Sequence, residues 1–206
     1  MSKLGRPLVM SADERRKEIL TVAEQLFCEK GFENVTMSEI ATALSMSKKT
    51  LYVQFQDKKE LLKELVTSSY VIDELQAQHD ENNVEALKQL LKISARHVLS
   101  DRHIQLCRLA IAESQNIDGL SQTFYELGIA KSRDQLILAI QKIDAKLYKI
   151  NISAEMMADI VFGASITKHF IDRLMLKTTV DLEEIYKKIE HSIDVLFVLS
   201  AHNMEE

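Results

Sequence analysis

The sequence predicts an all-α protein in which an N-terminal three-helix domain with a helix-turn-helix precedes a C-terminal helical bundle, about nine helices in all. Two observations carry this prediction. The chain of 206 residues contains one proline and five glycines, far fewer turn formers than a β-sandwich or a doubly wound sheet of this length needs. Apolar residues also recur at helical spacing along most of the chain, and several of these segments follow a capping signal.

The first expected helix begins after Ser11, which forms a capping box with Glu14, and it ends at the Lys30-Gly31 pair. Its apolar face consists of Ile19, Val22, Ala23, Leu26 and Phe27. A further helix is expected after Asp57, which is a good N-cap. The head of the chain therefore contains three short helices and the start of a longer fourth.

The stretch from Thr36 to Phe55, TMSEIATALSMSKKTLYVQF, predicts a short helix, a tight turn and a second short helix. Thr36 and Glu39 form a capping box, and Ser47 is a good N-cap for the second helix. Leu51 and Phe55, four residues apart, anchor that helix inward. Its cationic and hydrogen-bonding residues then lie outside, as reading a DNA major groove requires. A plain helical hairpin with a solvated basic edge is the alternative that the spacing leaves open.

The residues on that outer side suit contacts with DNA. Lys48 and Lys49 can donate to phosphates or to guanine, and Gln54 can pair with adenine or reach a phosphate. Thr50 and Tyr52 offer hydroxyl groups to phosphates and apolar surface to a thymine methyl group. The DNA-binding candidates are Thr36, Ser38, Lys48, Lys49, Thr50, Tyr52, Gln54 and Lys58, the last as a phosphate clamp at the start of the fourth helix.

The charge distribution favours a nucleic-acid partner although the chain as a whole is acidic. The net charge is −5, but residues 1–63 carry a net charge of +2 and the remainder carries −7. DNA binding depends on local positive potential rather than on the total charge. Residues 1–10, which include Lys3 and Arg6, are expected to form a flexible basic arm for the minor groove, with plain disorder as the alternative.

Residues Arg15 to Leu62, RRKEILTVAEQLFCEKGFENVTMSEIATALSMSKKTLYVQFQDKKELL, closely resemble the N-terminal domain of the TetR/AcrR family of transcriptional regulators. Ser45 and Lys49 depart from the family pattern, because glycine is common at both positions. The resemblance assigns phosphate or base contacts to Thr50, Tyr52, Gln54 and Lys58. It also implies a regulator, most often a repressor, that binds a near-palindromic operator in double-stranded DNA as a homodimer and is released by a small molecule. The alternative is a protein-binding adaptor or co-regulator that keeps the fold without a small-molecule effector; an enzyme is not expected.

The C-terminal part is expected to form a helical bundle. Its helices are predicted over residues 84–98, 104–113, 120–146, 153–174 and 181–201. Residues 106–165 resemble, more loosely, the C-terminal domain of AcrR-like regulators, which implies a small-molecule site and dimerisation through the last two long helices. We therefore divide the chain into an arm (1–10), a DNA-binding domain (11–63, with the helix-turn-helix at 36–55) and an effector-binding and dimerisation domain (64–206).

A pocket for a largely apolar effector is expected beside the fourth helix, because a bundle there gives a ligand leverage on the helix-turn-helix. Its expected lining is Leu65, Ser69, His97, Cys107, Tyr125, Phe162 and His169. The continuous apolar run at 195–199 exceeds what one buried face of the last helix explains, and it predicts a dimer interface. The expected interface residues are Ile193, Phe197 and Val198.

No cofactor, catalytic group or metal site is expected. His103 and Cys107 have a metal-compatible spacing, but the sequence names no third ligand. No apolar run approaches the roughly 18 residues of a membrane span, so no membrane partner is expected. The start of the chain lacks the apolar core of a signal peptide, which favours a cytoplasmic location, on the nucleoid when DNA is bound. Cys28 is, like Cys107, expected to be reduced.

Overall fold

The computed structural model describes residues 11–69, 84–176 and 178–198, and every structural statement below concerns these residues. Within them the only strand-like contact is an isolated bridge between Tyr148 and Phe197. The α-helices are α1 (Ala12–Lys30), α2 (Met37–Ala43), α3 (Lys48–Gln54), α4 (Lys58–Ser69), α5 (Val84–Val98), α6 (Asp101–Ala112), α7 (Leu120–Phe124), α8 (Lys131–Gln141), α9 (Ala154–Phe162), α10 (Lys168–Leu176) and α11 (Leu182–Leu196). Two π-helical segments, η2 (Tyr125–Ala130) and η4 (Gly163–Thr167), and one 3-10 turn, η3 (Ala145–Leu147), complete the described elements.

Several of these elements join into longer helices. α7, η2 and α8 follow one another without a break, and so do α9, η4 and α10. Counted in this way, the described part of the chain contains nine helices besides η3. The all-α fold class that the scarcity of turn formers predicts is thereby confirmed.

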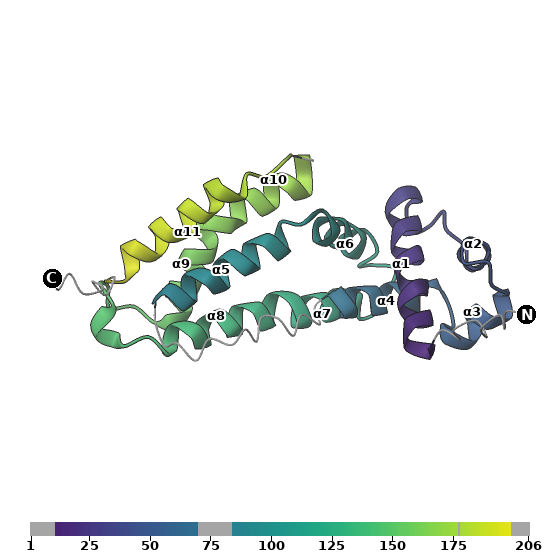
Figure 1. Cartoon of the computed structure of the whole chain (residues 1–206), viewed down its shortest axis with the longest axis horizontal. Coiled ribbons are helices and arrows are strands. Elements are labelled where there is room, and N and C mark those ends of the chain that lie inside the picture. Colours follow the sequence, from purple (N-terminus) through teal and green to yellow (C-terminus); the bar gives the residue numbers. More distant parts are fainter. Residues whose placement is uncertain (1–10, 70–83, 177, 199–206) are drawn as a thin grey trace, which may run out of the picture.

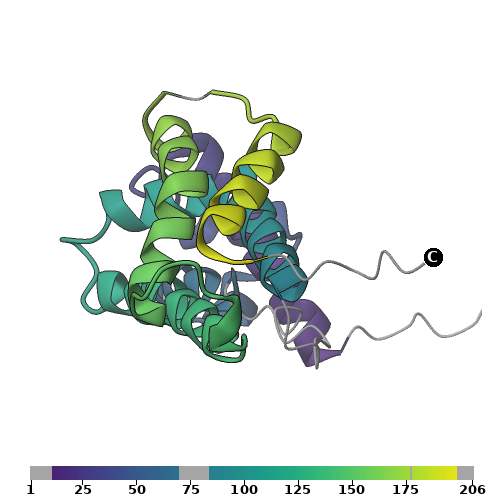
Figure 2. The ribbon, with the colours of Figure 1, turned by 90° about the vertical axis from the view of Figure 1, so that its left-hand side faces the viewer.

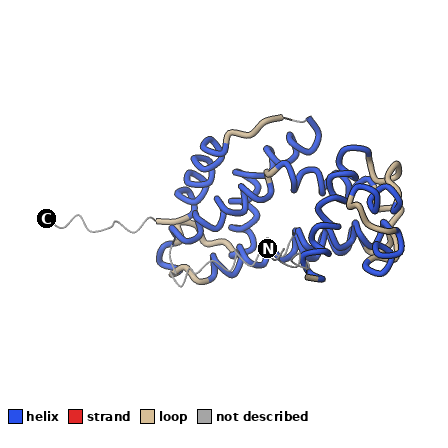
Figure 3. The backbone as a smooth tube through the Cα atoms, turned by 45° about the vertical axis from the view of Figure 1, so that its right-hand side comes forward, coloured by secondary structure: helices blue, strands red, loops and turns tan. Residues whose placement is uncertain are grey.

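The molecule is elongated, with α1, α2 and α3 toward one end and α8, α9 and α11 toward the other (Figure 1). We call α1–α4 the head and α5–α11 the body. α4 leads from the head to the body and contacts both α1 and α7. A view along the long axis shows the helices of the body packed side by side (Figure 2). Loops between the helices are mostly short (Figure 3).

Two hydrophobic clusters hold the described helices together. The first combines the buried side chains of the head with four buried side chains of the body, which are Leu106, Ala110, Ile117 and Leu120. The second lies within the body, where side chains of α5, α8, α9, η4 and α11 meet. Because body residues complete the core of the head, the packing does not divide at residue 64. The division of the chain into domains stays a prediction.

Side-chain caps begin the head helices at the predicted positions. The capping box at the start of α1 is complete, since the Glu14 N–H donates to Ser11 Oγ at 3.2 Å and the Ser11 N–H donates to Glu14 Oε2 at 2.8 Å. At α2, Thr36 Oγ1 accepts from the Glu39 N–H at 3.2 Å. The Glu39 carboxylate, however, binds the Lys30 ammonium group. The predicted second box is therefore half formed, and its acidic residue instead links α2 to the end of α1.

Two body helices end earlier than the apolar pattern predicts. The helix that begins at Leu120 ends at Gln141, and not at about Lys146. Asp144 Oδ1 accepts the Lys146 N–H at 3.0 Å, so a separate 3-10 turn begins there. α11 ends at Leu196, and the last predicted residues of that helix, 199–201, lie outside the described residues.

Phe197 leaves α11 in an extended conformation and is fully buried in the body. Its ring meets the Tyr148 ring edge-on, with 5.4 Å between the ring centroids. The backbone segments next to the two rings are hydrogen-bonded to each other as well, because the Lys149 N–H donates to the Leu196 carbonyl oxygen at 2.8 Å. The expectation that Phe197 is an exposed interface residue is therefore wrong, since its contacts lie within its own chain.

The other two expected interface residues differ from each other. Ile193 is fully buried in the second cluster, so it too belongs to the core of the single chain. Val198 remains on the surface and is 44% exposed. Its N–H donates to the Leu147 carbonyl oxygen at 2.7 Å, which fixes the backbone but leaves the side chain accessible.

Phe197→Ala should lower the free energy of unfolding by about 3–5 kcal/mol, because it removes a fully buried aromatic ring and leaves a cavity. Val198→Ala, one residue further on, should change it by no more than about 0.5 kcal/mol, as surface substitutions usually do. Urea unfolding followed by circular dichroism measures both. Equal small effects of the two variants would contradict the burial of Phe197.

Candidate nucleic-acid interface and effector region

Helix α3, the predicted recognition helix, is short and is held by two apolar anchors. Ser47 caps it, since its Oγ accepts the Thr50 N–H at 3.1 Å. Leu51 and Phe55 are buried in the core of the head. The side chains of Lys48, Lys49, Thr50 and Tyr52 are exposed. The structure thus places these four candidates together on one accessible helix, with donors for phosphates and base edges.

The turn between α2 and α3 is closed by two backbone bonds. The Met46 N–H donates to the Ala41 carbonyl oxygen at 2.9 Å, and the Ser45 N–H donates to the Thr42 carbonyl oxygen at 3.0 Å. Ser45 has a φ of 51°, in the left-handed region that favours glycine. Serine therefore adopts the conformation that glycine provides in this turn, and the angle between the two helices does not require glycine.

Two further candidates, Thr36 and Ser38, lie at the start of α2, at the end opposite this turn. Thr36 is exposed and Ser38 is partly exposed. The Ser38 carbonyl oxygen accepts from Thr42 Oγ1 at 2.9 Å. Thr36 Oγ1 already serves as the N-cap of α2, so a contact of Thr36 with DNA would have to share that oxygen.

Lys58 is engaged within the head. Its Nζ donates to the Phe32 carbonyl oxygen at 2.9 Å and to the Glu33 carbonyl oxygen at 3.2 Å, and it lies 4.4 Å from the centroid of the Phe32 ring. An ammonium group has three N–H donors, and Lys58 Nζ also lies 3.9 Å from Glu33 Oε2, so a phosphate would compete with that carboxylate for the third donor. The phosphate contact of Lys58 stays a prediction, but the side chain also stabilises the turn between α1 and α2.

The end of α3 shows one residue that the sequence analysis missed. Val53 is 74% exposed, although an apolar side chain on a short helix is usually turned inward. It lies one helical turn after Lys49, on the accessible side of α3, where it can contact a thymine methyl group. The sequence could have indicated the exposure of Val53, because this residue lies outside the four-residue spacing of the buried anchors Leu51 and Phe55. Gln54, by contrast, is only partly exposed.

Of the residues expected to line an effector pocket, His97 lies in a group of rings in the body whose other members were not expected there. The rings of His97 and His103 lie 4.7 Å apart, centroid to centroid. Phe124 and Phe170 each lie 6.4 Å from His103. Cys107, one turn further along α6, is buried, and burial raises the pKa of its thiol to about 12. We call His97, His103, Phe124 and Phe170 the imidazole–aromatic cluster.

Other expected pocket residues lie elsewhere. Tyr125 is 56% exposed, and its neighbour Phe124 occupies the position in the cluster instead. Phe162 packs against the second hydrophobic cluster. His169 Nε2 lies 3.0 Å from Lys188 Nζ on α11. Leu65 and Ser69 are buried, but Leu65 belongs to the core of the head.

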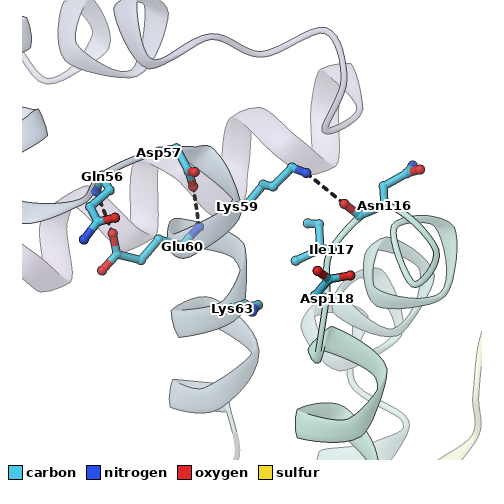
Figure 4. A pocket seen from close by; sticks show the side chains of 8 residues that line it. All are labelled: Gln56, Asp57, Lys59, Glu60, Lys63, Asn116, Ile117 and Asp118. Carbon is cyan, nitrogen blue, oxygen red and sulfur yellow. Dashed lines mark hydrogen bonds between the residues drawn. The ribbon is translucent and has the colours of Figure 1, made fainter.

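A surface crevice of about 460 Å³ lies between the start of α4 and residues 113–119 (Figure 4). Its lining residues are Gln56, Asp57, Lys59, Glu60, Lys63, Asn116, Ile117 and Asp118. Lys59 joins the two walls, because its Nζ donates to the Asn116 carbonyl oxygen at 2.9 Å. Asp57 and Glu60 serve as caps of α4. None of the expected effector residues lines this crevice, so it is distinct from the predicted pocket.

Among the described residues, no group of three or more His, Cys, Asp or Glu side chains is arranged to hold a metal ion. Across the same ranges, no helix combines the length and the apolar character that crossing a bilayer requires.

The imidazole–aromatic cluster should make stability depend on pH. Burial lowers the pKa of His103 from 6.5 to about 4, and charges on His97 and Arg102 add to the shift. The folded protein therefore keeps His103 neutral while the unfolded chain binds a proton. The stability that the neutral ring contributes is complete above about pH 6.5 and is lost as the pH falls to about 4, a loss of about 3 kcal/mol.

Urea unfolding at pH 7, 5.5 and 4.5 measures this loss. His103→Phe, which keeps a ring in the cluster, should reduce the dependence on pH over this range. His191→Phe, at an exposed position of α11, is the matched control and should leave it unchanged. An identical pH dependence in all three proteins would contradict the burial of a neutral His103.

Two family patterns match the chain, one in the head and one in the body. The pattern of the bacterial regulatory proteins of the tetR family matches residues 19–65, and that of the C-terminal domain of AefR-like transcriptional repressors matches residues 85–198. The biofilm operon icaADBC negative transcriptional regulator IcaR of Staphylococcus epidermidis is 32% identical over 79 residues, which are 37% of this chain and 43% of that protein. The chain thus matches less than half the length of this relative.

Solved structures share the fold over most of the chain. A TetR-family transcriptional regulator from Mesorhizobium loti has a TM-score of 0.77 at 23% identity, covering 91% of this chain and all of that one. The flavonoid-responsive regulator FrrA has a TM-score of 0.69 at 22% identity, covering 89% and 95%. Since both family patterns match, in the order of head and body, the chain belongs to the TetR family of DNA-binding transcriptional regulators, which are not enzymes.

Proposed function

We propose that this regulator is a homodimeric repressor that binds a near-palindromic operator and is released by a small molecule. The observation that carries the proposal is the accessible α3, which presents two lysines and two hydroxyl groups while Leu51 and Phe55 hold its other side in the core. A helix of this kind reads bases in the major groove, and a dimer presents two of them to successive grooves. DNA binding would then occur in the cytoplasm, on the nucleoid.

The proposed contacts divide by their chemistry. Lys49 and Val53 read base edges, since Lys49 can donate to guanine and Val53 can contact a thymine methyl group. Lys48 and the hydroxyl groups of Thr50 and Tyr52 bind phosphates. The remaining proposed contacts are Thr36, Ser38, Gln54 and Lys58.

Lys49→Ala should change which bases are preferred, whereas Tyr52→Phe should weaken binding to operator and unrelated duplex by the same factor. Loss of one hydroxyl contact should cost about 1 kcal/mol, or roughly a factor of five in Kd. Fluorescence anisotropy over a range of salt concentrations, with duplexes recovered by genomic pull-down, measures both. Lys146→Ala, in exposed η3 of the body, is the control and should change neither.

A wild-type protein with no salt-sensitive affinity for any genomic duplex would contradict the proposal, because phosphate contacts make binding depend on salt. That result would favour the alternative function, a protein-binding adaptor or co-regulator with a helix-turn-helix fold.

The proposed dimer face is an exposed apolar row on the continuous helix of α9, η4 and α10. Met156 and Ile160 lie four residues apart on α9, as do Ile171 and Met175 on α10, and all four are exposed. Between them, a Cβ atom added at Gly163 would meet no atom within 4 Å. The row is therefore open to close approach by a second helix, and a twofold dimer would cover it on both chains.

Ile171→Glu should convert the protein to monomers, because the dimer would have to bury an unpaired carboxylate in an apolar contact. Ile129→Glu, on η2, is the matched control, since Ile129 is similarly exposed but lies outside the row. Light scattering at micromolar concentration reads the mass of each. Monomeric wild-type protein, or a dimeric Ile171→Glu variant, would rule out this face.

The proposed effector site is the imidazole–aromatic cluster, where α5, α6, α7 and α10 meet. Aromatic rings beside two imidazoles suit a largely apolar molecule with one or two polar groups. The structurally similar FrrA is, by its name, responsive to flavonoids, which supports an aromatic small molecule as the class. α6 carries His103 in the cluster and also places Leu106 in the core of the head, so a ligand there can bias the head.

A flavonoid or other aromatic compound that binds the body should weaken the binding of operator DNA. Bound operator should in turn weaken the binding of that compound by the same factor. His97→Ala should weaken binding of that ligand roughly fivefold, the effect of one lost hydrogen bond, and it should leave DNA affinity without ligand unchanged. Calorimetric titration with and without operator measures this linkage. Additive, unlinked binding of ligand and operator would contradict release by a small molecule.

A further inference from the structure

Arg16 of α1 contacts three parts of the head at once. Its Nε donates to Glu64 Oε1 at 2.6 Å, and its Nη2 binds the other carboxylate oxygen of Glu64 on α4. Its Nη1 donates to the Gln54 carbonyl oxygen, at the end of α3, at 3.0 Å. The guanidinium carbon lies 4.2 Å from the centroid of the Phe55 ring. One side chain therefore joins α1, the end of α3 and α4.

The recognition helix has few other anchors. α3 has seven residues, and Leu51 is the one among them that is buried. The last carbonyl groups of a helix have no partner within the helix, and Arg16 supplies one to Gln54. A cation at this end also interacts favourably with the helix dipole. Arg16 is thus the polar counterpart of the apolar anchors Leu51 and Phe55.

The three contacts require the geometry of arginine. A planar guanidinium can bind a carboxylate through two N–H groups, donate a further N–H to a carbonyl oxygen and stack on an aromatic ring. Lysine keeps the charge, but its ammonium group is a point charge and cannot hold these partners in the same fixed directions. Arg16→Lys therefore removes the geometry and keeps the charge.

We infer that Arg16 is a positioning residue for base reading, which fixes the end of α3 relative to α4 and thereby sets the discrimination between operator and other DNA. The inference rests on the proposed DNA-binding function. Hydrogen bonds to base edges need accurate placement of the helix, within about 0.5 Å. Lysine contacts with phosphates tolerate more movement, because the charge acts over longer distances and the side chain is flexible.

Arg16→Lys should therefore lower the ratio of operator affinity to unrelated-duplex affinity by about tenfold to a hundredfold, the range expected when one base contact is lost. The affinity for unrelated duplex and its salt slope should stay unchanged, because the charge is kept. Arg15→Lys is the matched control. Arg15 is the neighbouring arginine, and its Nη1 lies 3.3 Å from Glu18 Oε2 on the same helix.

Glu64→Gln provides a second variant. It removes the charge of the carboxylate that binds Arg16, and it leaves the bond from Arg16 to the Gln54 carbonyl oxygen possible. It should lower the same ratio by a smaller factor than Arg16→Lys. Urea unfolding of each variant separates positioning from folding, because a smaller folded fraction lowers both affinities equally and leaves their ratio constant. An unchanged ratio in folded Arg16→Lys protein overturns the inference.

The positional part of the inference can be measured without DNA. Amide chemical shifts of residues 48–55 in ¹H–¹⁵N spectra should change in Arg16→Lys and stay unchanged in Arg15→Lys. If wild-type protein binds no duplex, the proposed function fails, and these shifts still decide the role of Arg16. Unchanged α3 shifts in Arg16→Lys would overturn it independently of any DNA measurement.

Discussion

The head depends on one constraint, which is that its helices α2 and α3 are too short to be stable alone. α2 and α3 have seven residues each, whereas isolated helices shorter than roughly 12–15 residues are marginal in water. Burial of Ile40, Leu51 and Phe55 in the core of the head must supply their stability. Leu106 and Leu120 of the body belong to the same core. The surface that α3 presents is therefore set partly by how the body packs against the head.

The sequence predicts those features of the head that depend on neighbours within a few residues. The caps at Ser11 and Ser47 form between groups three residues apart, and local spacing is enough to identify them. Leu51 and Phe55 are identified as anchors for the same reason, because one helical turn separates them. The accessible side of α3 then follows, since the side chains outside that spacing have to face solvent.

The features that the sequence does not predict depend on distant partners or on a change of helical phase. Arg16 meets Glu64, and Phe197 meets Tyr148, across 48 and 49 positions of the chain, and no local pattern specifies either pair. The prediction of Tyr125, and not Phe124, as a residue of the effector site fails for another reason. The π-helical segment η2 begins at Tyr125, and its wider turn shifts the direction of side chains away from the period of 3.6 residues.

The described contacts make α6 the junction between head and body. Arg102 of α6 binds both carboxylate oxygens of Glu24 on α1, at 2.8 and 2.9 Å. Two turns later, Arg108 donates to the carbonyl oxygens of Arg173 and Leu174 on α10, at 2.7 and 3.0 Å. α6 is therefore bonded to α1 through Arg102 and to α10 through Arg108, so a displacement of α10 that moves α6 would also act on α1. On the proposed function, an effector in the imidazole–aromatic cluster acts on α6 and α10 together. Coupling to α3 then needs no further element, because α6 already completes the core on which α3 rests.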